Sequence, residues 1–354
     1  MNILRFQGAV ARLLPGQSDN TRWIGSPTAS DVSFVAQTAS HVGEAAAAVG
    51  YLTKNGISAR IFLPSPPTGV TRRLRRSFHR SIEAQTQMTL SGLDYGSQLV
   101  SVADIVSTSS KLVVFNDWGM PRDLVSRANQ HGLETFGWVE GFQDFNNVDL
   151  ERKELPYRTV QRVLGLVPSE NQFFESNQFH LIGSSRLANI EQRQIPYSDR
   201  AIDVLVNLNF SYGVSRRYSR QWADKVVRAC EANGREVFFT RHPLDKPGWG
   251  YRYESVGPLG AVVGDAKTLI TRSGTALLDG LAAGCDVIFF NPNFERAAKY
   301  LVDEFPDIQE VHTECELSVA LSNCSSVNKE LRSVGRFSDC DPLELLFSVL
   351  VKPD

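Results

Sequence analysis

The sequence lacks several features that would place it in well-known classes of protein. No apolar run reaches the ~18 residues that a transmembrane helix requires, and the segment from Met1 to Gln7 lacks the apolar core of a signal peptide. The five cysteines form no Cys-x-x-Cys pair, which argues against a zinc site or a disulfide framework and suits reduced thiols. We therefore expect a cytoplasmic protein that associates at most peripherally with a membrane.

The charge balance also narrows the possible partners. The formal net charge is −2 at pH 7, which argues against broad binding to nucleic acid. No cluster of metal-ligating side chains is evident, so we expect no metal and no other cofactor. The chain has 354 residues, which suits two domains that each bury a core.

Strand and helix patterns alternate along almost the whole chain. The apolar run Lys111–Asp117, for example, precedes a helix predicted over Pro121–His131, and similar units recur after residue 200. Repeated strand–helix units predict parallel sheets covered on both faces. The polar segment Ser184–Arg200 reads as a linker. We predict an α/β protein of two Rossmann-like, doubly wound domains facing a cleft, with domain boundaries at residues 1–195 and 196–354.

A turn in the second half predicts a phosphate site. The strand that starts at Lys267 ends in Arg272, Ser273, Gly274 and Thr275, and a helix follows. Open N–H groups and the dipole at the start of a helix favour an anion. Asp279, one turn into this helix, is either a solvated charge or an acceptor for ribose hydroxyls.

Two further strand ends add candidate donor-binding residues. Arg241 and His242 follow the strand that begins at Glu236, just before a proline, and offer cationic or hydrogen-bond donor groups. Asn209 ends the first strand of the second half. Ligands of such sheets bind beyond the carboxyl ends of the strands, so we expect all three residues to face the donor.

These motifs resemble those of GT-B glycosyltransferases. Ser273-Gly274-Thr275-Ala-Leu-Leu-Asp279 is similar to the Ser-Gly-Thr-Ala-x-Leu-Glu turn of lipid A disaccharide synthase, with Asp in place of Glu. Arg241-His242-Pro243 resembles the His-Pro motif of Kdo transferases and sialyltransferases, which use CMP-linked sugars. The resemblance implies a C-terminal half that holds the nucleotide-sugar donor and an N-terminal half that holds a glycan or glycolipid acceptor. It also implies work in surface-polysaccharide or lipopolysaccharide synthesis, at or near the inner membrane, in a complex that assembles the polysaccharide.

We expect the catalytic carboxylate at the cleft edge of the N-terminal half, where apolar strands end. Glu140 and Asp144 flank Gly141 after an apolar strand, and Asp117 ends the preceding strand. A carboxylate there would activate the acceptor hydroxyl as a general base, or act as the nucleophile of a retaining enzyme. The alternative is that Glu140 caps a loop and Asp144 is solvated.

The resemblance favours a metal-independent glycosyltransferase with a CMP-linked donor such as CMP-Kdo. A UDP-sugar transferase and a nonhydrolysing sugar-nucleotide epimerase share the fold and are the alternatives within enzymes. An inactive nucleotide-sugar binding subunit is the alternative outside them. Turnover without an acceptor would identify an epimerase, and donor binding without turnover would identify the inactive subunit.

Overall fold

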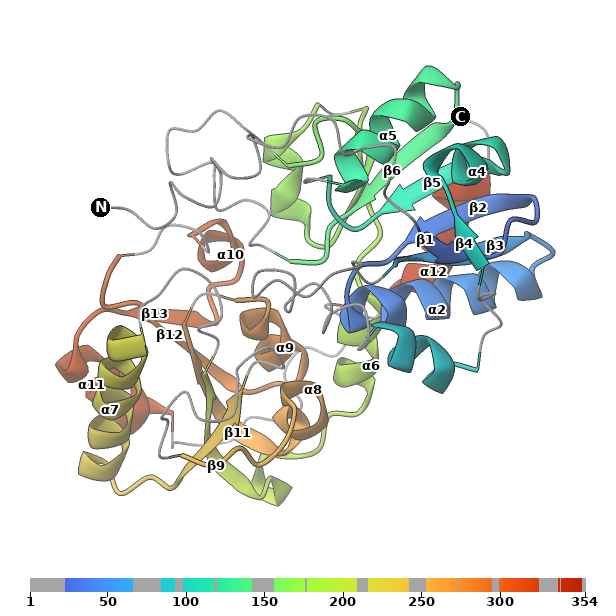
Figure 1. The fold of residues 1–354 in the computed structure, drawn as a ribbon. Coiled ribbons are helices and arrows are strands. Elements are labelled where there is room, and N and C mark those ends of the chain that lie inside the picture. The colour runs from blue at the N-terminus through green and yellow to red at the C-terminus, as the bar shows by residue number, and fades with distance from the viewer. Residues whose placement is uncertain are drawn as a thin grey trace. The chain divides into compact units, whose positions relative to one another are not determined.

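The computed structural model describes residues 23–65, 84–92, 98–117, 120–141, 156–175, 177–208, 216–241, 253–272, 274–294, 299–324, 337 and 339–351. The chain divides into two compact units (Figure 1). Unit 1 lies within residues 1–140, 153–185 and 340–354, and unit 2 within residues 141–152 and 186–339. Unit 2 resumes at Arg186, ten residues before the predicted boundary at residue 196, and residues 340–354 belong to unit 1 and not to the second unit.

Unit 1 is built on an eight-stranded sheet with the order β4-β1-β3-β2-β5-β6-β7-β8. The strands from β3 to β8 in this order pair in parallel, as predicted, but β1 pairs antiparallel with both β3 and β4 at one edge. The sequence analysis missed β1 and β4, because each has only three residues. The elements are β1 Trp23–Gly25, β2 Ser30–Val35, α2 Ala39–Lys54, β3 Ala59–Pro64, β4 Gln98–Val100, α4 Val102–Ser107, β5 Ser109–Val114, α5 Met120–Gln130, β6 Glu134–Trp138, β7 Arg162–Gly165, the 3-10 helix η4 Pro168–Phe173, β8 Phe179–Leu181 and α12 Pro342–Val351.

The core of unit 1 explains why the last helix belongs to it. The apolar face of α2 packs on alternate residues of β2, β3, β5 and β6, and Leu346 and Leu350 of α12 join the same core. Burial of such side chains stabilises a fold by about 1.5–3 kcal/mol each. The apolar C-terminal helix therefore packs beside α2, far from its neighbours in the sequence.

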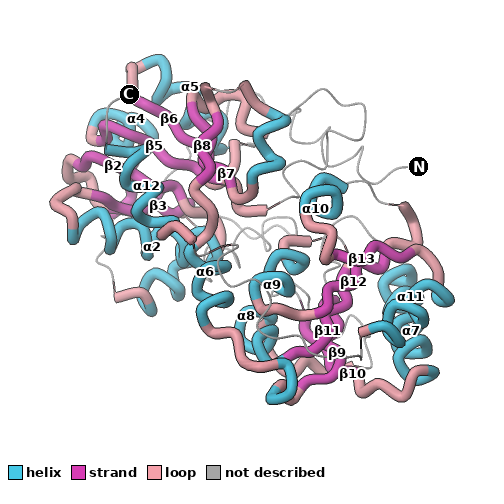
Figure 2. Tube along the Cα trace, turned by 180° about the vertical axis from the view of Figure 1, so that it is seen from behind, coloured by secondary structure: helices cyan, strands magenta, loops and turns pink. Residues whose placement is uncertain are grey.

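Unit 2 holds a five-stranded, fully parallel sheet with the order β10-β9-β11-β12-β13. Helices α7 and α11 lie side by side on one face (Figures 1 and 2), whereas α9 packs on β11 and β12. Its elements are α6 Ser185–Gln192, which begins at the boundary, the 3-10 helix η5 Tyr197–Asp199, β9 Ile202–Leu208, α7 Arg216–Ala232, β10 Val237–Arg241, α8 Leu259–Val262, the 3-10 helix η6 Val263–Asp265, β11 Ala266–Thr271, α9 Ala276–Ala282, β12 Asp286–Phe290, α10 Lys299–Glu304, β13 Ile308–Val311 and α11 Glu314–Asn323.

The segment predicted as a linker is structured. It contains α6 and η5 and ends in Arg200, which is buried. The guanidinium of Arg200 donates to the carbonyl oxygens of Ala266 at 2.8 Å and Ala283 at 2.7 Å, so it holds the segment against the start of β11 and the end of α9. The segment is therefore a structured part of the fold that is attached to unit 2 through Arg200.

Candidate active site

Three strand ends of unit 1 bring polar side chains to one edge of the sheet. Strands β2, β5 and β6 are parallel neighbours, so the residues that follow them share the carboxyl edge. Gln37 follows β2, Asn116 follows β5 and Glu140 follows β6. Asn116 Nδ2 donates to Gln37 Oε1 at 2.8 Å, which ties two of the loops together. This is the edge at which ligands of doubly wound sheets bind.

A buried histidine lies against Glu140. His41 is in the first turn of α2, whose N-cap is Thr38, and only 1% of its surface is exposed. Its Nε2 lies 2.5 Å from Glu140 Oε2, a close contact whose angle is not that of a regular hydrogen bond. The side chain of Glu140 is 35% exposed. Solvent and substrates can therefore reach the carboxylate but not the imidazole.

The surroundings of His41 fix which ring nitrogen carries a proton. The backbone N–H of Gln37 donates to His41 Nδ1 at 3.1 Å, so Nδ1 must be unprotonated. The proton of the neutral ring is then on Nε2, the nitrogen that lies in close contact with Glu140. The sequence analysis missed His41 as a site residue. The signal that could have found it is a histidine in the first turn of an otherwise alanine-rich, apolar helix.

A stack of three rings holds the histidine in place. His41 stacks on Phe115 with centroids 4.7 Å apart, and Phe115 stacks on Trp138 with centroids 5.2 Å apart. The hydroxyl of Tyr157 lies 2.8 Å from the carbonyl oxygen of Phe115 and 3.0 Å from that of Trp138. A Cβ at Gly137 would overlap the ring of Tyr157, so a glycine is required where the tyrosine crosses β6. The stack is thus anchored at the ends of β5 and β6.

The carboxylate of Asp117 holds a neighbouring loop in place. Its carboxylate is fully buried and accepts hydrogen bonds from the N–H of Tyr157 at 2.8 Å, the N–H of Thr159 at 3.2 Å and the hydroxyl of Thr159 at 3.0 Å. Tyr157 has a φ of 58°, which is costly for a bulky residue and must be held by its surroundings. The bonds to Asp117 supply that restraint, so its carboxylate is not available as a base.

In unit 2 the predicted donor residues gather at the carboxyl edge of the second sheet. Arg241 ends β10, Arg272 follows β11, and Gly274 and Thr275 lead into α9. Arg241 donates through Nη2 to the carbonyl oxygen of Tyr253. The guanidinium of Arg272 lies 6.0 Å from the centroid of the Tyr218 ring. The hydroxyl of Thr275 makes no capping hydrogen bond to α9, so Thr275 is not an ordinary N-cap.

Asp279 is not a solvated charge, which was one of its two predicted roles. It is 5% exposed and pairs with Arg186 of α6. Its predicted contact with ribose hydroxyls stays a prediction. Among the other predicted site residues, Asp144, Asn209, His242 and Ser273 lie outside the described residues.

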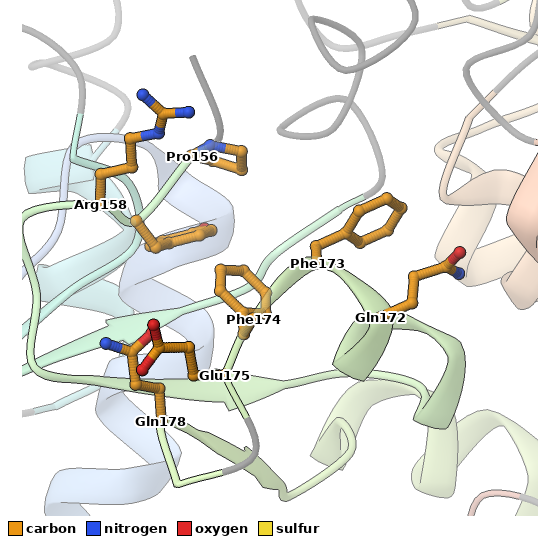
Figure 3. A pocket seen from close by; sticks show the side chains of 8 residues that line it. Pro156, Arg158, Gln172, Phe173, Phe174, Glu175 and Gln178 are labelled. Carbon is orange, nitrogen blue, oxygen red and sulfur yellow. The ribbon is translucent and has the colours of Figure 1, made fainter. Parts of the chain in front are cut away.

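Unit 1 also contains a groove of about 320 Å³ (Figure 3). Three aromatic side chains, Tyr157, Phe173 and Phe174, line it together with polar ones that include Gln172 and Gln178. Its lining therefore combines ring faces with about as many polar and charged side chains. Tyr157 connects this groove to the strand ends beside Glu140.

Within the described part of the chain, no group of three or more His, Cys, Asp or Glu side chains could hold a metal ion. The same part contains no helix that is both long and apolar enough to span a bilayer.

Comparison with known proteins identifies the fold. Comparisons with family models and with curated proteins find no match. Among solved structures, the UDP-GlcNAc 2-epimerase of Methanocaldococcus jannaschii, in complex with UDP-GlcNAc and UDP, has a TM-score of 0.59 at 13% identity and covers 90% of this chain and 99% of that one. The epimerase of Neisseria meningitidis bound to UDP-GlcNAc has a TM-score of 0.57 at 10% identity over 91% and 99%. The spinosyn forosaminyltransferase SpnP has a TM-score of 0.54 at 12% identity over 92% and 100%.

The chain has a GT-B fold. This confirms the predicted fold class, with its two units of mainly parallel strands. The similarity does not support the CMP-Kdo part of the resemblance, because the bound nucleotides named for these structures are UDP compounds. The strand-end motifs predict contacts to phosphate, which all nucleotides share, so they could not identify the base.

Proposed function

We propose that this protein is a glycosyltransferase that moves a sugar from a UDP-linked donor to a glycan or glycolipid acceptor, with Glu140 as the general base. The observation that carries the proposal is the accessible Glu140 carboxylate held against the buried His41 at the carboxyl edge of the unit 1 sheet. UDP replaces CMP as the donor nucleotide because structures of the same fold hold UDP compounds.

The reaction needs one proton acceptor. Glu140 removes the proton of the acceptor hydroxyl while that oxygen attacks the anomeric carbon of the donor sugar. The bond from this carbon to the phosphate oxygen breaks, and UDP leaves with the electron pair. A positioned base of this kind contributes about 10²–10⁴-fold to a rate. His41 does not touch substrate in this scheme; its fixed ring keeps Nε2 in close contact with the carboxylate and so positions it.

The donor diphosphate is proposed to bind at the edge of the unit 2 sheet. Arg272 and Thr275 are the described groups that we assign to it, together with the predicted contacts of His242, Ser273 and Asn209. Guanidinium groups and preorganised N–H groups stabilise the negative charge that develops on a leaving phosphate. The aromatic groove of unit 1 is the proposed acceptor site, because ring faces and amides suit the apolar faces and hydroxyls of a sugar.

A UDP-sugar epimerase is the second candidate. The similarity to the two UDP-GlcNAc 2-epimerases favours it. The two reactions differ in what they need: an epimerase converts the UDP-sugar alone, whereas a transferase releases UDP only when an acceptor is present.

The test has two steps. First, a thermal-shift panel of UDP, CMP, CDP and GDP should show the largest stabilisation with UDP, because a ligand that binds the folded state raises its apparent stability. Second, purified protein is incubated with UDP-GlcNAc with and without glycan acceptors, and the products are followed by NMR. A larger shift with CMP, or no turnover under either condition, would refute the proposed function.

A further inference from the structure

An exposed aromatic residue in unit 2 has an unusual backbone. Phe294 follows β12, and 68% of its surface is exposed. Its φ is 54°, a value that bulky side chains rarely adopt. Its N–H donates to the carbonyl oxygen of Asn291 at 3.2 Å, which closes the turn. Strained residues of this kind cluster at binding sites, and here the strained backbone presents an apolar ring to solvent.

The far side of this ring is held by a histidine. His312 follows β13 and stacks on Phe294 with centroids 4.3 Å apart and an interplanar angle of 20°. His312 Nδ1 lies 2.8 Å from the carbonyl oxygen of Asn291, so this nitrogen is the donor. Asn291 is 2% exposed and donates to Glu310 Oε1 at 2.7 Å. The two rings therefore form a rigid pair with one open aromatic face.

The pair stands at the edge where we place the donor. Strand β12 lies between β11 and β13 in the sheet, and all three are parallel. Phe294 follows the carboxyl end of β12, and the proposed diphosphate contacts Arg272 and Thr275 follow that of the neighbouring β11. We propose that Phe294 is a stacking surface for a ring of the bound nucleotide sugar. This inference rests on the proposed function, and the ring is either the uracil or the apolar face of the sugar.

The experiment measures the dissociation constants of UMP, UDP and UDP-GlcNAc by calorimetry for the wild type and for Phe294→Ala, Phe294→Gly and Phe294→Tyr. Loss of one ring that stacks on a base weakens binding about ten-fold to a hundred-fold. We expect that loss in the Ala and Gly variants and near wild-type binding in the Tyr variant. Val319→Ala, which removes an apolar side chain of 60% exposure from α11, is the matched control and should change nothing.

Phe294→Gly also separates binding from folding. Glycine adopts positive φ without strain, so this variant should melt no lower than Phe294→Ala while binding as weakly. Weaker binding of all three ligands assigns the ring to uracil, and weaker binding of UDP-GlcNAc alone assigns it to the sugar. Unchanged dissociation constants in the Ala and Gly variants would overturn the inference. A wild type that binds none of the three ligands would instead overturn the proposed function and this inference with it.

Discussion

Substitution of His41 offers a sharp test of the proposed base. Phenylalanine at this position keeps a ring that can stack on Phe115, but it has no donor for Glu140. Glutamine loses the ring but places an N–H donor near the position of Nε2. In the wild type the Gln37 N–H donates to His41 Nδ1 at 3.1 Å. Both variants lose this acceptor nitrogen, so its loss does not distinguish them.

The expected magnitudes follow from these contacts. A regular hydrogen bond to a charged group contributes about 1.5–3 kcal/mol, which is the upper limit for the angled contact between His41 and Glu140, and each 1.36 kcal/mol corresponds to tenfold in rate. We therefore expect His41→Phe to lower kcat by up to about 100-fold, and His41→Gln to recover most of it. His41→Gln should be less stable than His41→Phe, because the ring stack contributes about 0.5–1.5 kcal/mol beyond burial and only phenylalanine keeps it.

The assay compares kcat, KM for the UDP-sugar and the melting temperature of the two variants. KM should change little, since the proposed donor contacts lie in unit 2. The reasoning fails if His41→Phe turns over within about twofold of the wild type. It also fails if activity simply follows the melting temperature, because His41 would then be a core residue that supports the fold.

Three other outcomes are expected. Glu140→Gln should lower turnover by about 10²-fold or more at an almost unchanged melting temperature. Its control, Glu231→Gln at an exposed position on α7, should change neither turnover nor melting temperature. Normal turnover of Glu140→Gln would place the base elsewhere. Burial raises the pKa of Asp203, but the bidentate hydrogen bonds and the charge of Arg235 outweigh it and lower that pKa. This stabilisation is present at neutral pH and is lost as the pH falls through the acid range. Asp203→Asn should therefore lower the free energy of unfolding by about 1–3 kcal/mol at pH 7, and urea titrations should show the difference between wild type and variant narrowing below pH ~4. A difference in unfolding free energy that does not depend on pH would contradict this. Gly137→Ala should cost about 1–3 kcal/mol by displacing the ring beneath the strand ends, and a melting temperature equal to the wild type would contradict the packing.

Much of the fold could be predicted because its signals are local. The helix predicted over Pro121–His131 is α5 Met120–Gln130, which differs from it by a single residue at each end. Apolar period and glycine stops act within a few residues, so they survive without tertiary information. The predicted fold class followed from the alternation of such elements.

The placement of distant segments could not be predicted in this way. Nothing in residues 342–351 indicates that this apolar helix packs on α2 instead of on its neighbours, because an apolar face is satisfied by any apolar partner. The polar segment that begins at Ser184 likewise looked like a linker, since the acceptors of Arg200 are backbone carbonyls and backbone carbonyls have no sequence signature.

The candidate site shows the same difference between what the sequence predicts and what the tertiary structure decides. The sequence by itself determined that carboxylates and guanidinium groups follow apolar strands, since polar residues at strand ends are visible in the pattern. Only the tertiary structure decided what each of them contacts: Asp117 holds a loop, Asp279 pairs with Arg186, and Glu140 lies beside His41. The reason is physical. The role of a carboxylate depends on burial and on partners that lie from 40 to 99 positions away in the chain, and sequence spacing carries no information about either.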